Sequence, residues 1–360
     1  MKTMAIVIPT LEPDHRLPEL ICRLRELMPL NPIIVVNDGS SATCDPIFAE
    51  ITKHEKLILL THEVNRGKGS ALKSAMAYYL ENYPEGIGVV TADGDGQHLP
   101  EDILRCAERL AAGDNALVLG VRNFSGGDVP RKSRFGNELT KKMMALVLGY
   151  PIPDTQTGLR GIPVAFIPRL LKLKGARFEY ETAMLLVCRS SGFSLAEVEI
   201  GTVYMDSNKG THFRPVCDSV KIYWLMLKYG VIEWTIFTST GLVSALLDLT
   251  LFTILLKTLP WNHRLLWSVV IARVISASCN YLLNKNLTFR KGGKSWWDAR
   301  SFAQYAGLCV VILAASYYLT RVGLKQFPKI NATVVKATVD IFLFAVSFYL
   351  QKLVVFRGRR

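Results

Sequence analysis

The sequence predicts an α/β domain with a doubly wound sheet, followed by an all-α domain of four membrane spans. Two features of the 360-residue chain support this. Up to about residue 229, short apolar runs alternate with helix-like stretches, as in sheets whose strands are joined by crossover helices. From there on, long apolar runs dominate. The expected domains are therefore residues 1–229 and 230–360.

The sheet is predicted from short apolar runs that end in Gly, Asp or Asn, the pattern of parallel strands buried on both faces. Ligands bind beyond the carboxyl ends of such strands, and polar residues gather at these ends. They are Thr10 and Glu12, Asp38, and residues 93–97. The expected strands lie within 5–10, 33–40, 57–63, 87–96 and 116–123, and the expected helices are 17–27, 68–80 and 100–110.

The second half contains four apolar runs, each long enough to cross a bilayer. They are 234–256, 265–283, 302–319 and 332–356, the last interrupted by Lys336 and Asp340. Two basic, apolar stretches, 131–150 and 212–230, have the pattern of helices lying in the membrane interface. An ordinary surface helix is an equal alternative for the first. No internal repeat is evident.

Charge and cysteine usage narrow the class of partner. The net charge is +13 and half of the residues are apolar, which favours a lipid bilayer and phosphorylated substrates over nucleic acid. The seven cysteines are scattered without a Cys-x-x-Cys pair, as expected of buried thiols in a reducing compartment. The first apolar run is short and meets Pro9, so no signal peptide is expected and the N-terminal domain should be cytoplasmic.

The segment Thr-Ala-Asp-Gly-Asp-Gly-Gln-His, 91–98, carries the sharpest chemical motif. Asp93, Asp95 and Gln97 alternate, so an extended segment would place them on one side. Their oxygens suit Mg²⁺ or Mn²⁺, which would neutralise charge on a leaving diphosphate. An EF-hand is excluded, since it needs Gly and Glu where His98 and Leu104 stand. A plain polar turn is the structural alternative.

Other residues suit phosphate or nucleotide binding. Asp38 could recognise a base or ribose, or cap a helix. Lys68 begins a helix after Gly67, where phosphate is favoured, although a plain loop–helix junction explains it equally. Arg122, Arg131 and Arg134 could hold phosphate or form a basic surface facing anionic lipid. Residues Asp154, Gln156, Thr157 and Arg160 suggest a polar cleft, with Glu181 and Lys209 as weaker candidates.

These motifs together resemble glycosyltransferase family 2, and most closely its dolichyl-phosphate mannose synthase and bacterial polyisoprenyl-phosphate branch. The resemblance covers about 5–229 and includes the segments 8–13, 35–40, 65–69, 93–98, 154–161 and 178–181. It implies a GT-A nucleotide-sugar fold. It departs at Gly94, where Ala is more usual, and at Leu11, where Tyr is often found. Residues 231–356 are similar to the four-span GtrA-like family, proposed to help carry the lipid-linked sugar across the membrane.

The resemblance also implies roles. Asp93 should contact the nucleotide, Asp95 and Gln97 the metal, and Pro9, Thr10, Glu12 and Asp38 the base and ribose. Lys68 and Lys209 would join this nucleotide-sugar site, and Asn137 the acceptor-phosphate site of Arg122, Arg131 and Arg134. The expected reaction is inverting transfer of a hexose-type sugar from a UDP- or GDP-sugar to undecaprenyl phosphate. The alternative is a lipid-linked sugar transporter or scaffold with an inactive transferase domain. The sequence leaves open whether the chain forms a homo-oligomer.

The predicted spans contain the charged residues Asp248, Arg273 and Asp340. An unpaired charge at the bilayer centre costs at least ~2.5–3.5 kcal/mol, so such residues usually pair inside a bundle. The simplest pair joins Arg273 to Asp248 or Asp340. The basic loop between the second and third spans and the basic C-terminus predict that both termini are cytoplasmic. The basic segment 321–329 would then lie outside, against the rule.

Overall fold

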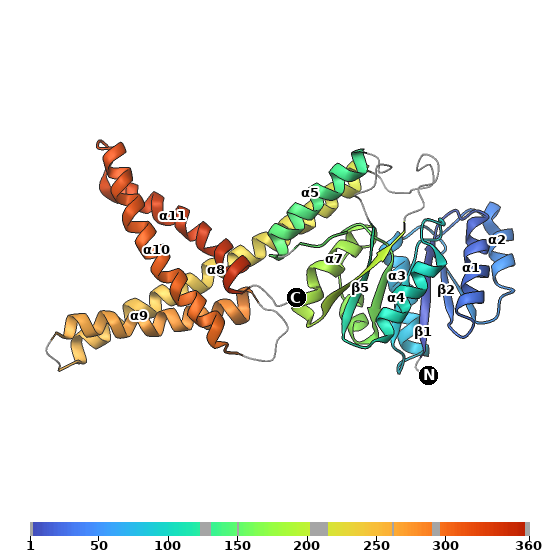
Figure 1. The fold of residues 1–360 in the computed structure, drawn as a ribbon, viewed down its shortest axis with the longest axis horizontal. Coiled ribbons are helices and arrows are strands. Elements are labelled where there is room, and N and C mark those ends of the chain that lie inside the picture. The colour runs from blue at the N-terminus through green and yellow to red at the C-terminus, as the bar shows by residue number, and fades with distance from the viewer. Residues whose placement is uncertain are drawn as a thin grey trace. The chain divides into compact units, whose positions relative to one another are not determined.

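The computed structural model describes residues 3–122, 131–149, 151–201, 215–260, 263–289 and 296–356. The chain divides into two compact units, one of residues 1–145 and 151–227 and the other of 146–150 and 228–360. One boundary falls inside the long helix α8 (Pro215–Thr258), and another falls near the end of α5 (Arg131–Leu148). Figure 1 shows the sheet of the first unit and the long helices of the second.

The first unit is built on a seven-stranded mixed sheet of order β3-β2-β1-β4-β6-β5-β7. All five expected strands are present and share one direction. The short β6, between β4 and β5, is antiparallel to both, and β7 pairs in parallel with β5. The strands are β1 (Met4–Thr10), β2 (Ile33–Asn37), β3 (Leu57–Thr61), β4 (Gly88–Thr91), β5 (Ala116–Arg122), β6 (Arg160–Pro163) and β7 (Ser194–Ile200).

Helices cover both faces of this sheet. On one face, α1, α2 and α4 bury a continuous core that includes Leu17, Ile21 and Ile103 against Ile6 and Ile8 of β1. On the other face, α3 contacts β1 and β2 and packs against α6 and α7. These helices are α1 (Arg16–Leu27), α2 (Asp45–Ile51), α3 (Lys68–Asn82), α4 (Pro100–Ala111), α6 (Ile167–Leu171) and α7 (Glu179–Cys188). The expected α/β class and its three helices are confirmed.

The second unit contains the four candidate membrane spans. They are Cys217–Thr258, Arg264–Thr288, Ala299–Gln326 and Val334–Val355, all long and apolar enough to cross a bilayer. They correspond to α8, α9 (Arg264–Leu283), α10 (Ala299–Gln326) and α11 (Ala332–Leu350). The two stretches expected to be interfacial helices are helical, as α5 (Arg131–Leu148) and the first turns of α8.

The four spans form two hairpins, α8–α9 and α10–α11, that repeat one another, although the sequence shows no repeat at first reading. Each second helix ends in a π-helical turn, Asn284–Thr288 and Gln351–Val355. Each turn has the pattern Asn/Gln-Lys-x-x-x-Phe and closes alike. Phe289 N donates to Asn284 O at 2.8 Å, and Phe356 N to Gln351 O at 2.7 Å.

Contacts between the hairpins follow the same equivalence. Trp234 of α8 packs on Phe348 of α11 with ring centroids 4.6 Å apart, and Phe302 of α10 packs on Tyr281 of α9 at 5.2 Å. The equivalent residues Asn284 and Gln351 bond each other, with 3.1 Å from Nδ2 to Oε1. The hairpins are joined at this end and diverge away from it (Figure 1).

Candidate functional site

A cavity of about 410 Å³ opens at the carboxyl ends of β1, β2 and β4. This volume falls in the range of small-ligand sites. Its walls include seven of the expected nucleotide and metal residues: Pro9, Thr10, Glu12, Asp38, Lys68, Asp93 and Asp95. The wall residues to which the sequence analysis gave no binding role are Leu11, Pro13, Asp14, Arg16, Asn65, Gly67, Ala71, Gly94, Arg177 and Phe178.

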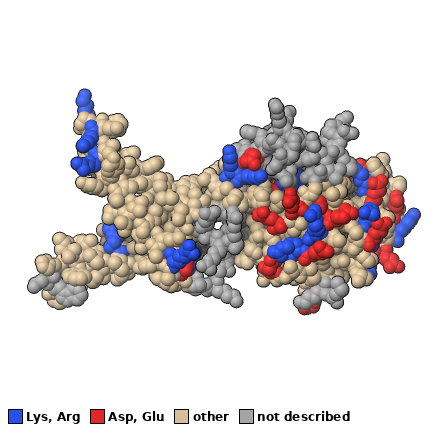
Figure 2. All heavy atoms as spheres, in the orientation of Figure 1, with Lys and Arg blue, Asp and Glu red and all other residues tan. Residues whose placement is uncertain are grey.

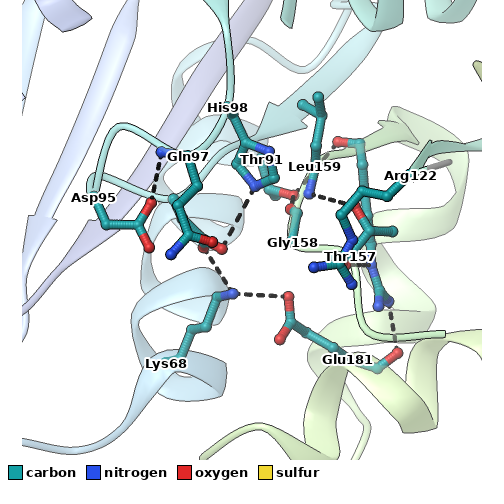
Figure 3. Close-up of polar contacts among 12 residues, drawn as sticks. Lys68, Thr91, Asp95, Gln97, His98, Arg122, Thr157, Gly158, Leu159 and Glu181 are labelled. Carbon is teal, nitrogen blue, oxygen red and sulfur yellow. Dashed lines mark hydrogen bonds and ion pairs between the residues drawn. The ribbon is translucent and has the colours of Figure 1, made fainter. Parts of the chain in front are cut away.

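Asp93 lies at the centre of a charged cluster beneath this cavity. Lys68 Nζ, at the first turn of α3, is 2.7 Å from Asp93 Oδ1 and 3.1 Å from Glu181 Oε1 of α7. Figure 3 shows Lys68 pointing between the β4 loop and Glu181. Burial would raise the pKa of Asp93, but the charge of Lys68 and the nearby His98 hold it well below its usual value. Asp93 is therefore a fixed carboxylate.

His98 is the second polar neighbour of the Asp93 carboxylate. Its Nε2 is 3.5 Å from Asp93 Oδ2, and the atom is buried without a hydrogen-bond partner at good geometry. We read this contact as electrostatic, because 3.5 Å exceeds a well-formed N–H···O bond. The two neighbours of Asp93 thus differ: Lys68 is a direct ion-pair partner and His98 is a polar neighbour.

Asp95 sits in a tight turn, so the expectation of an extended segment with three aligned side chains is wrong. Asp95 Oδ1 accepts a hydrogen bond from Gln97 N at 3.0 Å, and Gly96 adopts φ +76°. This turn separates the three residues: Asp93 and Asp95 border the cavity, whereas Gln97 is not among its wall residues. Burial and the charge of Asp93 raise the pKa of Asp95.

Asp38 lines the cavity but is also bonded inward. Its Oδ1 accepts from Arg66 N at 2.9 Å and its Oδ2 from Gly67 N at 2.7 Å. His62 Nδ1 lies 2.7 Å from Oδ1, and the same ring reaches Ser74 Oγ through Nε2 at 2.9 Å. Because the bonded amides directly precede Lys68, Asp38 fixes the start of α3. Of the two roles expected for Asp38, base or ribose recognition and helix capping, the capping role is closer to this arrangement.

The loop 154–160 supports Asp93 from behind. A Cβ added at Gly158 would stand 2.4 Å from Asp93 Oδ2, closer than real Cβ atoms come. Thr91 Oγ1 donates to Gly158 O at 2.7 Å and anchors the loop to β4. The glycine is therefore required by the close approach of the carboxylate, which explains its place in the motif.

Most of the remaining residues of this loop are interior and are not among the wall residues of the cavity, whereas the sequence predicts that they line a polar cleft. Asp154, Thr157 and Arg160 are at most 1% exposed. Arg160 donates from Nε to Thr157 O at 3.0 Å and from Nη1 to Glu181 O at 2.6 Å. Burial lowers the pKa of Arg160. Glu181 is also buried, and Gln156 alone of the five is exposed.

Arg122 is paired with the buried Asp154. Its Nε donates to Asp154 Oδ2 at 2.7 Å and its Nη2 to Oδ1 at 3.0 Å, a two-pronged arrangement. This bonding ties β5 to the loop that carries Gly158. The expected phosphate role of Arg122 would have to operate alongside this pair. Four expected site residues, Arg131, Arg134, Asn137 and Lys209, have side chains outside the described residues.

The donor set at the cavity fits a hard divalent cation that shares its ligands with substrate. Asp93 and Asp95 are close enough for the charge of one to raise the pKa of the other. A cation would relieve that repulsion. Within the described part of the chain, no three His, Cys, Asp or Glu residues gather to hold a metal. The ion would therefore take most ligands from phosphate and water, as Mg²⁺ commonly does.

The charged residues of the spans form pairs, as expected. Arg273 Nη2 is 3.2 Å from Asp248 Oδ2, and Ser276 Oγ donates to Asp248 Oδ1 at 2.8 Å. Asp340 pairs with Lys336 one turn earlier and accepts from Ser316 Oγ at 2.7 Å. Of the two partners considered for Arg273, the structure selects Asp248.

Comparison with known proteins assigns both domains. Residues 5–171 match the family model Glycosyl transferase family 2, and residues 236–356 match GtrA/DPMS, transmembrane domain. The chain thus consists of a family 2 glycosyltransferase domain fused to a GtrA/DPMS transmembrane domain. This confirms the resemblance inferred from the motifs and the predicted fold class.

Individual proteins also resemble this chain. The UDP-N-acetylglucosamine–dolichyl-phosphate N-acetylglucosaminyltransferase of Methanococcus voltae is 27% identical over 251 residues, covering 64% of this chain and 97% of its own. The polyprenol monophosphomannose synthase of Mycolicibacterium smegmatis is 26% identical over 207 residues, covering 54% and 75%. Glucosyl-3-phosphoglycerate synthase from Mycobacterium tuberculosis, solved with Mn²⁺, UDP and phosphoglyceric acid, aligns with a TM-score of 0.46 at 18% identity, covering 63% and 77%.

Proposed function

We propose that the protein transfers a hexose-type sugar, with inversion, from a UDP- or GDP-sugar to a polyisoprenyl phosphate at the cytoplasmic membrane face. The observation that carries the proposal is the pair Asp93 and Asp95 at a cavity of about 410 Å³, in a chain with four candidate spans. The two relatives that act on dolichyl phosphate and polyprenol support the acceptor class.

The cavity residues would bind and orient the donor. Pro9, Thr10 and Glu12 at the end of β1 would hold the base and ribose, beside the α3 turn that Asp38 fixes. Asp93, kept ionised by Lys68, would contact the nucleotide, and Asp95 would hold Mg²⁺ or Mn²⁺. Bound there, the ion supplies positive charge to the diphosphate that leaves.

The acceptor needs little activation. A lipid phosphate is already anionic at neutral pH, so its oxygen can attack the anomeric carbon directly from the face opposite the leaving diphosphate. The protein's contribution is then positioning and charge stabilisation. Arg131, Arg134 and Asn137 are the candidates for holding the acceptor phosphate, with Arg122 at the end of β5.

The test is product formation by the purified full-length chain. The protein with Mn²⁺ is incubated with a panel of radiolabelled nucleotide sugars and undecaprenyl phosphate, and lipid extracts are analysed for labelled product. We expect one sugar to enter the lipid fraction, and Asp95→Asn to abolish it. If no sugar is transferred or hydrolysed while nucleotide sugars bind, the transferase proposal is wrong and the transporter or scaffold alternative takes its place.

A further inference from the structure

A groove lies between α10 and α11, at the end of this hairpin remote from Gln351. It has a volume of about 490 Å³ and is lined by Tyr317, Thr320, Arg321, Leu324, Lys325 and Lys336. The five residues from α10 recur every three or four positions, so they share one helix face. Figure 2 shows Lys and Arg side chains gathered at the tip of this hairpin, on an otherwise uncharged surface.

The groove contains more positively charged side chains than its ion pairs neutralise. Lys336 Nζ donates to Ser316 Oγ at 3.0 Å and pairs with Asp340. Arg321 and Lys325 form no ion pair with any residue in the described part of the chain. Thr320 Oγ1 is buried without a hydrogen-bond partner. The lining thus offers two uncompensated cations and an unused hydroxyl.

Placing such cations in a membrane domain costs free energy, so their presence indicates a function. Lys336 lies within the fourth span, where an ionisable residue is unfavourable and usually functional. The α10 helix has 28 residues and is roughly 42 Å long, more than the ~30 Å hydrocarbon core. At least one end of the helix must therefore extend beyond the core, and the charges of Arg321 and Lys325 favour placing its last turns at the headgroup level.

The internal repeat shows that the hairpin fold does not require this charge. In the α8–α9 hairpin the positions equivalent to Tyr317, Thr320, Arg321 and Lys336 are occupied by Leu249, Phe252, Thr253 and Val269, whereas Leu256 and Lys257 match Leu324 and Lys325. The equivalence extends to this depth, because Asp248 with Arg273 and Ser316 with Asp340 meet at matching positions. One hairpin is therefore specialised where the other is largely apolar.

We propose that the α10–α11 groove binds the phosphate group of an anionic membrane lipid. The Arg321 guanidinium provides a planar fork suited to phosphate oxygens, and Lys325 and Lys336 add point charges. Tyr317 and Leu324 supply surface for the attached chain or headgroup. Basic pockets between membrane helices bind lipid headgroups by this chemistry. The proposal is independent of the transferase reaction.

The test uses the purified full-length protein in detergent and counts bound lipid by native mass spectrometry. Phosphatidylglycerol and undecaprenyl phosphate are the anionic probes, phosphatidylcholine is the zwitterionic control and inorganic phosphate is the soluble competitor. The variant Arg321→Gln/Lys325→Gln removes the two unpaired cations and leaves Lys336 to neutralise Asp340. The matched control is Thr253→Gln/Lys257→Gln at the equivalent positions of the other hairpin.

We expect the groove variant to lose affinity for at least one anionic lipid by about tenfold or more, and the control to bind as the wild type does. The two anionic probes identify which lipid carries the phosphate. The proposal is overturned if the groove variant binds both anionic lipids as the wild type does, or if the control variant loses as much affinity as the groove variant. It is also overturned if binding of phosphatidylcholine falls in the groove variant as binding of the anionic lipids does. Excess inorganic phosphate should weaken lipid binding by the wild type and not by the groove variant, because the groove recognises the phosphate group; equal competition in both proteins would also overturn the proposal.

Discussion

Gly158 stands directly behind Asp93, so close that a Cβ at 158 would lie 2.4 Å from Asp93 Oδ2. We predict that Gly158→Ala displaces the carboxylate and thereby weakens nucleotide-sugar binding. The added methyl group should also lower the free energy of unfolding by about 1–3 kcal/mol, as is typical of overpacking. Donor affinity by isothermal titration is the measurement. Gly307→Ala in α10, where the added methyl group meets nothing within 4 Å, is the control. Unchanged donor affinity in Gly158→Ala would show that Asp93 does not set the donor site.

The ion pair between Lys68 and Asp93 leads to a second prediction. Lys68→Met leaves Asp93 and Glu181 without their shared cation; removing one partner of a fully buried pair costs about 3–5 kcal/mol, and the loss should be smaller here because the Asp93 side chain is 30% exposed. Lys68→Met/Glu181→Gln should recover part of the loss, because it removes one of the two unpaired carboxylates. Denaturant unfolding of both variants measures the effect. A double variant no more stable than the single one would contradict this account.

The same pair has a pH dependence. Because the pKa of Asp93 is lowered on folding, its contribution to stability is present at neutral pH and is lost only as pH falls through that lowered value. Lys68→Met removes the main cause of the lowering. The stability difference between wild type and variant should therefore shrink on acidification towards pH values below the ordinary Asp value of 3.8.

The pKa of Asp95 shifts in the opposite direction to that of Asp93. Its pKa is raised by burial and by Asp93, so the folded protein holds this proton more tightly than an unfolded chain does. Metal must displace that proton. We predict that Mn²⁺ affinity declines with falling pH at a midpoint above 3.8, and that Asp95→Asn lowers transfer roughly a hundredfold or more. Mn²⁺ titrations followed by electron paramagnetic resonance test the affinity, and the amount of labelled lipid product tests the transfer. Near-normal turnover of Asp95→Asn in EDTA would exclude the metal role.

Local patterns in the sequence predict much of this fold, and the tertiary contacts explain where they fail. The five parallel strands follow from apolar runs, but β6 is only Arg160–Pro163, too short and too rich in Gly and Pro to show a strand period. At the site, the motifs predict the cavity residues at the ends of β1, β2 and β4. They do not predict the contact between Lys68 and Glu181, because it depends on how α3 packs against α7.

Two further misses have physical causes. The alternation of Asp93, Asp95 and Gln97 indicates an extended segment only if the backbone continues the strand, and the hydrogen bond from Gln97 N to Asp95 turns it instead. The repeat in the membrane domain is not evident in the sequence because lipid-facing positions accept any apolar residue. Only the positions at its joined end, such as Asn284 and Gln351, preserve a recognisable pattern.

The last prediction concerns Asp248 and Arg273. Two observations favour a structural role for the pair: Ser276 also bonds Asp248, and the equivalent positions of the second hairpin, Ser316 and Asp340, are likewise joined. Arg273→Leu should therefore leave a carboxylate unpaired in the span and destabilise the protein by about 2.5–3.5 kcal/mol.

The double variant Arg273→Leu/Asp248→Asn should restore most of this loss, because no charge is then left without its partner. Thermal unfolding in detergent measures stability, and labelled lipid product measures activity in the same preparations. Asp340→Asn serves as the matched control in the other hairpin, where Lys336 would in turn be left unpaired. If Arg273→Leu is as stable as the wild type but delivers no lipid-linked sugar, the pair does not serve packing. Arg273 would then act on the lipid itself.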